Sequence, residues 1–355
     1  MSYLADHIQA MRGYTYGEQP SDLSVVKLNT NENPYPPSPV VREVLANLDL
    51  DELRRYPDAT SSALRDRIAA EYGLRSEQVL ITNGGDEAIR LVATACLTPN
   101  SVLISTEPGY SLYLVIASVL NARYIPMQLG HDFRPDPTAA NRCIAQHARL
   151  VCIPNPNSPS GVLMSVDEVD AFAAQFPGPL LIDEAYVDFV EPDLKHDLVP
   201  LLSNHRNLLL LRTFSKGYSL AGARVGYLLG EESFISALSE KVRDSYNVNC
   251  VSQAMALAAF SDIAHARETW DAVRTERQRL TTALRNGGFN VPNSQANFVL
   301  PQRNDRTSMS ATYERLRMRN ILVRYFKTPR LHDRLRVTVG SSSENDAFLE
   351  ALFTC

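Results

Sequence analysis

Short apolar runs, spaced along the first two thirds of the chain, constrain its fold more than any other feature. Five of them have the length of a buried strand, and they cover Val79–Thr82, Ser101–Ser105, Leu150–Ile153, Leu180–Asp183 and Leu208–Leu211. Longer stretches with helical spacing of apolar residues follow several of these runs. Strands that alternate with helices assemble into a mainly parallel sheet with helices on both faces. The sequence therefore predicts an α/β fold.

The length of the chain indicates more than one domain. Its 355 residues exceed the roughly 250–300 that one hydrophobic core usually serves. Past Glu231 the pattern changes to long helical periodicities, followed by short strands and helices. We expect an N-terminal arm with part of a small domain over residues 1–45, a large domain over 46–245, and a small C-terminal α/β domain over 246–355.

Charge and cysteine usage limit the classes of partner. Lys plus Arg is 35 and Asp plus Glu is 40, so the formal net charge is −5. That argues against nucleic acid or an anionic membrane as partner, because basic charge dominates such binding. The five cysteines are odd in number and form no C-x-x-C pair, which fits a reducing compartment without a zinc site. With no signal-peptide pattern and no long apolar run, we expect a cytoplasmic protein that binds small molecules and no metal.

One polar stretch directly after the fifth run carries the strongest chemical signal. The run ends in Thr213, Ser215 and Lys216, and Arg224 follows among small residues. A lone lysine after a strand usually marks a solvated loop. Hydroxyls beside an arginine, however, make a good phosphate grip, because the guanidinium fork matches phosphate oxygens. A lysine held there could form an imine with an aldehyde on the same molecule, and pyridoxal phosphate is such a molecule.

Two further strand ends are candidates for the same site. Asp183 ends an apolar strand, where open α/β sheets bind ligands. Its carboxylate could keep a pyridine nitrogen protonated, and Tyr186 could donate to a ring hydroxyl; an acidic surface turn is the alternative. Gly85 and Asp86 open a helix whose backbone N–H groups could bind an anion, although Asp86 could equally be an ordinary N-terminal helix charge.

Three segments resemble a known family. The wording RTFSKGYSLAGARVGY at 212–227 resembles the lysine segment of fold-type I pyridoxal-phosphate aminotransferases, the aspartate aminotransferase superfamily. It is most similar to the histidinol-phosphate aminotransferase group, as is LNTNENPYPPSP at 28–39, and DEAYVDF at 183–189 is a third specific segment of the resemblance. The likeness covers about residues 22–340. It implies a fold-type I pyridoxal-phosphate-dependent transferase, with a large domain around the sheet and a smaller α/β domain.

The resemblance implies roles for individual residues. Lys216 would carry the cofactor and shuttle the substrate proton, while Asp183 and Tyr186 would hold the ring nitrogen and the ring hydroxyl. The family's second contact to that hydroxyl is an asparagine, which aligns with Ser158 here, so we expect the neighbouring Asn157 to serve. The remaining cofactor contacts implied are Gly85, Asp86, Tyr110 (stacked on the ring), Thr213, Ser215, Arg224, and Tyr56 reaching across the interface of a homodimer.

The resemblance also implies a substrate pocket. It places Tyr16, Asn31, Arg324 and Arg336 there, although Thr15 stands where the family usually has proline. On their own, the two arginines would be exposed strand residues. In the family, the arginine of LR-x-[TS]-x-G, here Arg336, pairs with the α-carboxylate of the substrate, and the ILVR arginine, here Arg324, lies at its distal end.

The expected reaction is therefore transamination between glutamate or 2-oxoglutarate and histidinol phosphate or imidazole-acetol phosphate, a step of histidine biosynthesis. An aromatic amino-acid aminotransferase and a threonine-phosphate decarboxylase-like enzyme remain alternatives, because related sequences share this wording. A non-catalytic protein that kept the cofactor site is a further alternative. Against it stands the intact set Lys216, Asp183, Tyr186 and Arg224. A nucleotide-binding enzyme is weaker still, since the chain has no G-x-x-x-x-G-K-[ST] motif.

Overall fold

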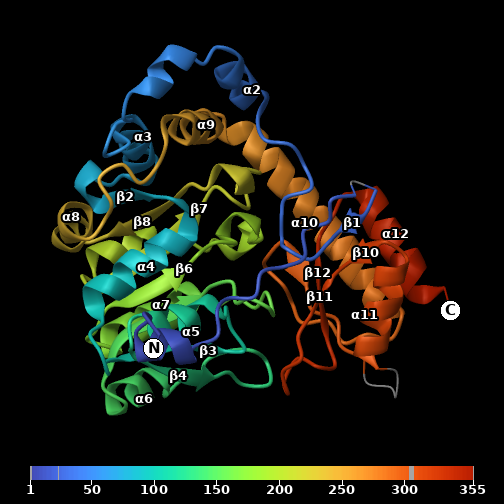
Figure 1. The fold of residues 1–355 in the computed structure, drawn as a ribbon. Coiled ribbons are helices and arrows are strands. Elements are labelled where there is room, and N and C mark those ends of the chain that lie inside the picture. The colour runs from blue at the N-terminus through green and yellow to red at the C-terminus, as the bar shows by residue number, and fades with distance from the viewer. Residues whose placement is uncertain (1, 23, 304–307, 355) are drawn as a thin grey trace.

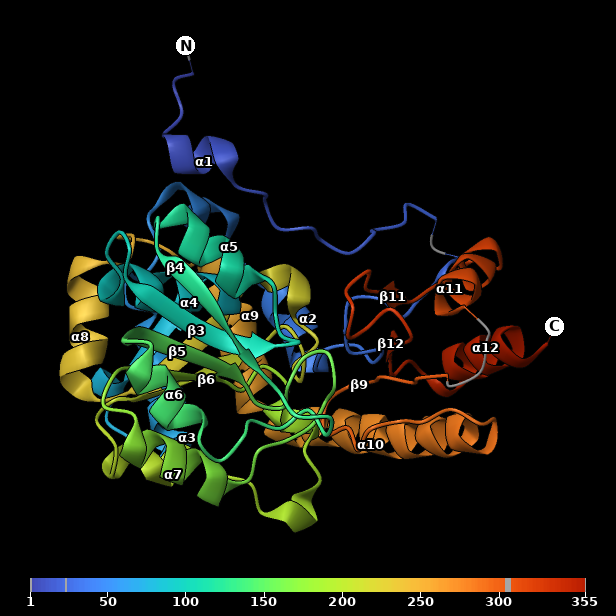
Figure 2. The same ribbon diagram turned by 90° about the horizontal axis from the view of Figure 1, so that it is seen from below.

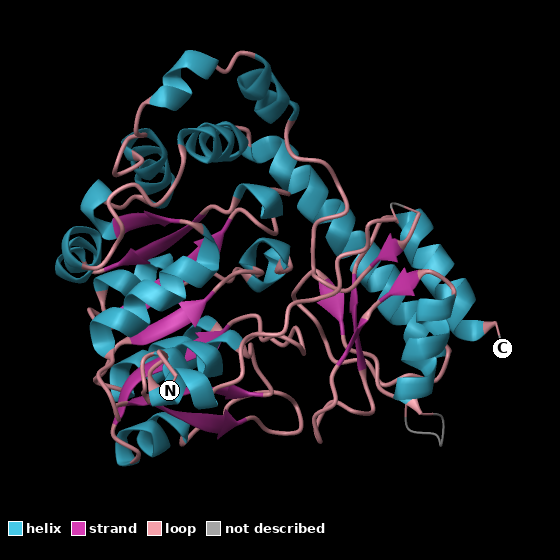
Figure 3. Ribbon diagram, in the orientation of Figure 1, coloured by secondary structure: helices cyan, strands magenta, loops and turns pink. Residues whose placement is uncertain are grey.

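The fold is built on a seven-stranded sheet, seen in a computed structural model that describes residues 2–22, 24–303 and 308–354. The strand order is β2-β8-β7-β6-β5-β3-β4. Only β8 runs antiparallel to its neighbours, β2 and β7, so the predicted mainly parallel sheet is confirmed (Figure 3). The strands are β2 (Val79–Thr82), β3 (Val102–Glu107), β4 (Arg123–Gln128), β5 (Ala148–Pro154), β6 (Leu180–Asp183), β7 (Leu208–Thr213) and β8 (Gly226–Gly230).

Both faces of this sheet are covered by helices, which explains the continuous apolar runs. In β7, Leu208 and Leu210 belong to the core on one face, while Leu209 and Leu211 belong to the core on the other. This alternation follows from the two-residue period of a strand. The covering helices include α3 (Ser62–Tyr72), α6 (Ala139–Ala145) and α7 (Val166–Gln175) on the first face, and α4 (Gly84–Cys96), α5 (Leu112–Val119) and α8 (Glu232–Lys241) on the second.

A smaller lobe lies beside the carboxyl ends of the parallel strands (Figures 1 and 2). Its three-stranded antiparallel sheet has the order β11-β12-β9, and β1 pairs in parallel with β10. The N-terminal segment thus belongs partly to this lobe. Its elements are β1 (Val26–Lys27), α10 (Ile263–Asn286), β9 (Phe298–Val299), α11 (Met309–Met318), β10 (Ile321–Leu322), β11 (Arg324–Tyr325), β12 (Leu335–Thr338) and α12 (Ser342–Phe353).

The chain passes between the lobes in two places, along the loop that follows β1 and along the helix α10. The helices α2 (Pro39–Ala46) and α9 (Cys250–Ser261) pack together, and Phe260 belongs to the core of the large sheet. In α10, Ala266 lies in that core, whereas Leu284 lies in the core of the smaller lobe. The predicted domain boundaries stay predictions. The packing of α9 favours a boundary after Ser261 over one at residue 245.

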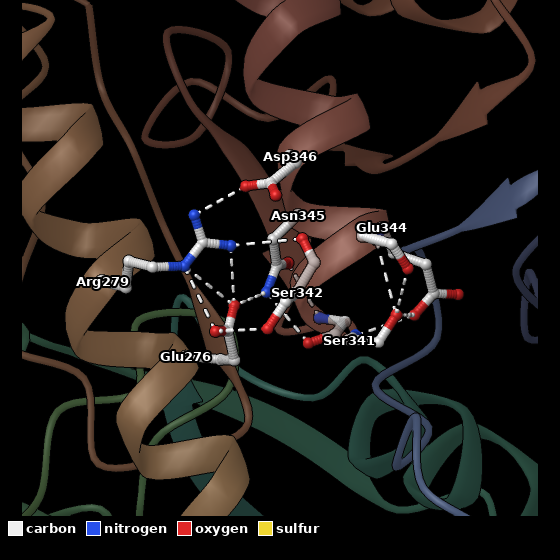
Figure 4. A network of polar contacts seen from close by, with 9 residues as sticks. Glu276, Arg279, Ser341, Ser342, Glu344, Asn345 and Asp346 are labelled. Carbon is white, nitrogen blue, oxygen red and sulfur yellow. Dashed lines mark hydrogen bonds and ion pairs between the residues drawn. The ribbon is translucent and has the colours of Figure 1, made fainter.

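A polar network fixes the start of α12 against α10 (Figure 4). The buried Glu276 accepts hydrogen bonds from Arg279 Nη2, Ser342 Oγ and Asn345 Nδ2, each at 2.8 Å. Arg279 also donates to Asp346 at 2.6 Å. A buried carboxylate is stable only when its oxygens are satisfied in this way. The network holds the turn that follows β12, and β12 carries one of the predicted substrate arginines.

The remaining elements are short. α1 (Asp6–Ala10) lies against α5, where His7 Nε2 is 3.2 Å from the carbonyl oxygen of Val119. Within the described ranges, no helix combines the length and the apolar character that crossing a membrane requires. Cys355 lies outside the described residues, and the other cysteines are unpaired. The 3-10 turns are Leu50–Arg54, Ser76–Gln78, Val187–Phe189, Pro192–Leu194, Val199–Ser203 and Ala221–Ala223.

Candidate active site

Lys216 lies just beyond the carboxyl end of β7, at the junction of the two lobes. Its Nζ donates to the carbonyl oxygen of Thr30 at 3.0 Å and lies 5.9 Å from the ring centre of Tyr186. Burial, aided by the charge of Arg336 and opposed by that of Glu32, lowers the pKa of Lys216 to about 8. A substantial fraction of the amine is therefore neutral near physiological pH, as a nucleophile or a base requires.

Asp183 is the last residue of β6 and is only 6% exposed. The hydroxyl of Tyr113 donates to its Oδ2 at 2.7 Å, and the backbone N–H of Ala185 donates to Oδ1 at 3.1 Å. Burial raises the pKa of Asp183 to about 6, although these hydrogen bonds oppose the rise. A carboxylate in this setting would be stabilised by a cationic ligand.

Tyr186 is oriented by Asn31, which is 1% exposed. Asn31 Nδ2 donates to the Tyr186 hydroxyl oxygen at 2.9 Å. The backbone of Asn31 has a left-handed φ of 57° and bonds to Thr338 and Asn297 of the smaller lobe. Because an amide nitrogen can only donate, the proton of the Tyr186 hydroxyl is left to donate to another group.

A cluster of charged and hydroxyl groups lies at the start of α4. Arg224 Nη2 is 3.2 Å from Asp86 Oδ2, and Arg224 Nη1 is 3.4 Å from Ser215 Oγ. Tyr110 donates to Asp86 Oδ1 at 3.1 Å. The backbone N–H of Ser215 donates to Thr213 Oγ1 at 3.1 Å. The structure thus brings these five predicted residues together.

Glycines allow Arg224 to approach this helix. Gly84 has a φ of 77°, and a Cβ atom there would lie 2.6 Å from Arg224 Nη2. Gly85 packs against Leu211, and the side chain of Asn83 does not cap the helix. The first backbone N–H groups of α4 are therefore free to bind an anion beside a guanidinium group. This donor set fits a phosphate group.

The turn after β5 places its two candidates differently. Asn157 Nδ2 donates to the carbonyl oxygen of Pro108 at 3.2 Å, and Asn157 Oδ1 accepts from Ser160. Ser158 Oγ lies 3.4 Å from Arg336 Nη1. The choice between Asn157 and Ser158 as a cofactor contact stays a prediction.

The two predicted substrate arginines lie opposite each other on β11 and β12. Arg336 donates to the carbonyl oxygen of Asn29 at 2.9 Å, and its buried Nε has no hydrogen-bond partner. Arg324 donates to the backbone oxygens of Thr15 and Tyr16. Across the described part of the chain, neither arginine forms an ion pair with a carboxylate. Like charges at paired strand positions repel each other, so this pair favours an anionic ligand.

Two predicted tyrosines are mainly exposed in the single chain. Tyr16 is joined to the predicted substrate site by its backbone oxygen, which accepts from Arg324, and the residue is 77% exposed. Tyr56 is 81% exposed and stacks on Tyr246 with ring centres 4.4 Å apart. Its contribution to a partner's site therefore stays a prediction.

Residue contacts that the sequence did not predict complete the site. Tyr113 lies in the first turn of α5, three residues after Tyr110, which precedes the helix, so its closeness to a predicted site residue was an available signal. Gly84 stands in a glycine pair before a helix, which is also recognisable. The contact between Thr30 and Lys216 joins residues 186 positions apart, and nothing local indicates it.

The chain matches a family of known proteins. Residues 24–352 match the family Aminotransferase class I and II. The chain is 38% identical to histidinol-phosphate aminotransferase 1 of Nostoc sp., covering 99% of this chain and 97% of that one. It is 40% identical to histidinol-phosphate aminotransferase 1 of Bradyrhizobium diazoefficiens, covering 97% of each chain.

Solved structures share the fold. Histidinol-phosphate aminotransferase from Sinorhizobium meliloti, in complex with pyridoxal-5'-phosphate, superposes with a TM-score of 0.90 at 24% identity, covering 99% of this chain and 97% of that one. A mutant aspartate aminotransferase of Thermus thermophilus gives a TM-score of 0.80 at 20% identity, covering 99% and 100%. The match across nearly the whole chain, together with the relatives near 38% identity, shows that this protein belongs to the class I and II aminotransferase family.

Proposed function

We propose that the protein is a pyridoxal-phosphate-dependent histidinol-phosphate aminotransferase. It would exchange an amino group between glutamate and imidazole-acetol phosphate, yielding histidinol phosphate and 2-oxoglutarate. The observation that carries the proposal is the meeting of Lys216, Asp183 and Tyr186 with the arginine pair Arg324 and Arg336 at the lobe junction. The names of the relatives near 38% identity support the substrate.

The donor set fits the cofactor. Its phosphate would be held at the open N-terminus of α4 by the backbone N–H groups of Gly85 and Asp86 and by the side chains of Thr213, Ser215 and Arg224. Pyridoxal phosphate supplies an aldehyde for covalent attachment to lysine and a ring that withdraws electrons. Asp183 would hold the ring nitrogen in its protonated form, Tyr110 would stack on the ring, and Tyr186, with Asn157 or Ser158, would contact the ring hydroxyl.

Lys216 is the proposed proton carrier. Its Nζ would take the proton from the α-carbon of the substrate and deliver it to the C4′ atom of the cofactor. The lowered pKa of about 8 keeps enough amine neutral for that task. The carbonyl oxygen of Thr30, 3.0 Å away, gives the amine a fixed resting position.

The arginine pair supports a substrate with two anionic ends. Guanidinium groups bind carboxylates and phosphates through a planar fork. We propose that Arg336 binds the α-carboxylate of glutamate and that Arg324 serves the distal end of each substrate. Tyr16 would line the entry to this pocket, and Asn31 would line it beside Tyr186. Arg324→Lys and Arg336→Lys should each raise KM about tenfold or more, because lysine keeps the charge and loses the fork. The exposed Arg206→Lys is the matched control.

The proposed assembly is a cytoplasmic homodimer with shared active sites, in which Tyr56 contacts the cofactor phosphate of the other subunit. The strong exposure of Tyr56 in the single chain supports this. Mixing Lys216→Ala chains with Tyr56→Ala chains tests it. If Tyr56 acts across the interface, each mixed dimer contains one intact site, and activity returns. If it acts within its own chain, mixing restores nothing. Tyr246→Phe is the control.

Absorbance of the cofactor-loaded protein tests the reaction itself. Rapid loss of the visible band of the lysine-bound cofactor with histidinol phosphate, and slow loss with phenylalanine, is the expected result. Equal or faster loss with phenylalanine would identify an aromatic aminotransferase, and release of carbon dioxide from threonine phosphate would identify a decarboxylase. Lys216→Ala should lack the visible band altogether, and a variant that keeps both band and activity would refute the assignment.

A further inference from the structure

A separate cavity of about 560 Å³ lies between the two lobes. The large lobe contributes residues 131–134, 162, 163, 165, 166, 194 and 196, and the smaller lobe contributes residues 290, 292, 293, 295 and 334. None of the predicted cofactor or substrate residues lines it. Its volume falls within the range of roughly 300–1,000 Å³ that is typical of small-molecule sites, and such sites favour domain interfaces.

Arg334 lines this cavity, and two of its buried nitrogens lack hydrogen-bond partners among the residues described. Its side chain is 12% exposed and packs on the ring of Phe133, with 5.1 Å between the guanidinium carbon and the ring centre. Its Nη2 donates to Gln302 at 2.8 Å, whereas its buried Nε and Nη1 have no hydrogen-bond partner among the residues described. Asp333 Oδ1 forms an ion pair with Nε at 3.6 Å, beyond hydrogen-bond distance. Buried N–H groups are nearly always paired in native proteins. Two unpaired nitrogens on one guanidinium group therefore suggest that an acceptor is missing.

The other charged groups of the cavity are already paired. Arg134 Nη1 donates to both oxygens of Glu168, at 2.9 and 2.7 Å, and Asp132 accepts from the backbone N–H of Arg134. Arg330, behind the cavity, donates to backbone carbonyl oxygens at the end of β4. Arg334, by contrast, has one ion pair with Asp333, without a hydrogen bond at that distance, and two buried nitrogens without a hydrogen-bond partner among the residues described. A guanidinium in this state matches a carboxylate or a phosphate.

The remaining walls suit a small organic molecule. Val162, Leu163 and Pro292 provide apolar surface, while Asn293 and Gln295 bring side-chain amides. A second buried nitrogen, Nε2 of His196, also lacks a hydrogen-bond partner within the described segments. The combination of apolar walls with a few polar groups is typical of ligand sites.

We propose that this interlobe cavity is a second binding site, which takes a small organic anion, a carboxylate or a phosphate ester, through Arg334.

The site is also connected to the turn after β5. Gln295 N–H donates to the carbonyl oxygen of Gly161 at 2.7 Å, and a Cβ atom on Gly161 would lie 2.0 Å from Ser294 Oγ. The turn that carries Asn157 and Ser158 therefore rests directly on the cavity's smaller-lobe wall. A ligand that touches both lobes binds one arrangement of them better, so it would alter substrate affinity.

Crystals of the cofactor-loaded protein soaked in tungstate provide a direct test. Tungstate is a tetrahedral oxyanion, and loading fills the proposed phosphate site beforehand. Anomalous density within hydrogen-bond distance of Arg334 is the expected result. Density only at Arg324 and Arg336, or none, would overturn the proposal while leaving the proposed reaction untouched.

Calorimetric titration in solution distinguishes the two kinds of anion. Inorganic phosphate and succinate are the probes, each with the cofactor-loaded wild type, Arg334→Gln and the exposed control Arg206→Gln. Arg334→Gln should weaken binding of the favoured probe at least tenfold, with Arg206→Gln unchanged. Equal binding by Arg334→Gln and wild type would refute the site.

A second variant separates a binding defect from a folding defect. Asn293 is exposed at the rim, so Asn293→Trp should narrow the cavity and leave Arg334 on Phe133. It should weaken binding of the same probe with an unchanged melting temperature. Full-strength binding by Asn293→Trp would count against the cavity as the site.

Discussion

Asp183→Asn should stabilise the cofactor-free protein, although the same change should damage the active site. In the folded chain the pKa of Asp183 rises from 3.8 to about 6, mainly because the carboxylate is buried. The difference of about 2 units corresponds to roughly 3 kcal/mol of destabilisation once the group is ionised in both states. Asparagine loses one hydrogen bond to Tyr113 or Ala185, worth about 1 kcal/mol. The net gain expected above pH 7 is about 2 kcal/mol.

The sign of the pH dependence follows from the direction of this shift. Between pH 4 and 6 the folded protein binds more protons at Asp183 than the unfolded chain does, so the wild-type free energy of unfolding falls as pH rises. Above pH 6 the contribution is constant. The advantage of Asp183→Asn should therefore shrink by about 1.5 kcal/mol between pH 8 and pH 5.

Urea unfolding of the cofactor-free proteins, followed by circular dichroism at pH 5 and pH 8, measures both quantities. Asp193→Asn, at an exposed carboxylate, is the matched control and should change little. With cofactor added, the order should reverse, because asparagine cannot supply the charge that a protonated ring nitrogen needs. A cofactor-free Asp183→Asn protein that is no more stable than wild type at pH 8, or whose advantage does not depend on pH, would refute the reasoning.

Three further outcomes are expected. Cofactor attachment to the cofactor-free protein should speed up with pH, with a midpoint at about 8 and a plateau roughly one unit higher, because only neutral Lys216 attacks; stopped-flow absorbance with a midpoint near 10 would contradict this. Asn31→Asp replaces the amide that donates to the Tyr186 hydroxyl with a carboxylate, which can only accept. The pKa of the imine nitrogen of the lysine-bound cofactor, followed by absorbance, should therefore rise by about 1 unit, and an unchanged pKa would contradict that contact. Gly217→Ala would place a Cβ 2.1 Å from Asp188 Oδ2 and should cost about 1–3 kcal/mol in urea unfolding, whereas Gly222→Ala, with open space around it, should be nearly neutral.

The sequence predicts five of the seven strands of the large sheet and misses β4 and β8. The central strands are buried on both faces, so their apolar runs are continuous and easy to recognise. β4 is an edge strand that carries Pro126 and several exposed side chains, so it lacks such a run. β8 begins and ends with glycine and lies in the segment interpreted as a ligand loop.

The same contrast holds within the active site. Lys216 and Asp183 directly follow or end buried strands, so their local wording indicates their position. The partners that set their chemistry are distant in sequence: Tyr113 is 70 residues from Asp183, and Asn31 is 155 residues from Tyr186. Such pairs depend on the packing of whole lobes, which no local pattern encodes.

The helix α10 couples the movements of the two lobes. Its 24 residues span about 36 Å, with Ala266 anchored in one core and Leu284 in the other. Trp270, between them, donates to the carbonyl oxygen of Gly217 at 2.7 Å, next to Lys216, the proposed catalytic lysine. If the helix stays straight, a rotation of about 10° at its first turn would move its far end by roughly 6 Å. The pivot of such a closing motion would then lie beside Lys216. The proposed reacting centre would therefore stay almost still while the predicted substrate arginines move.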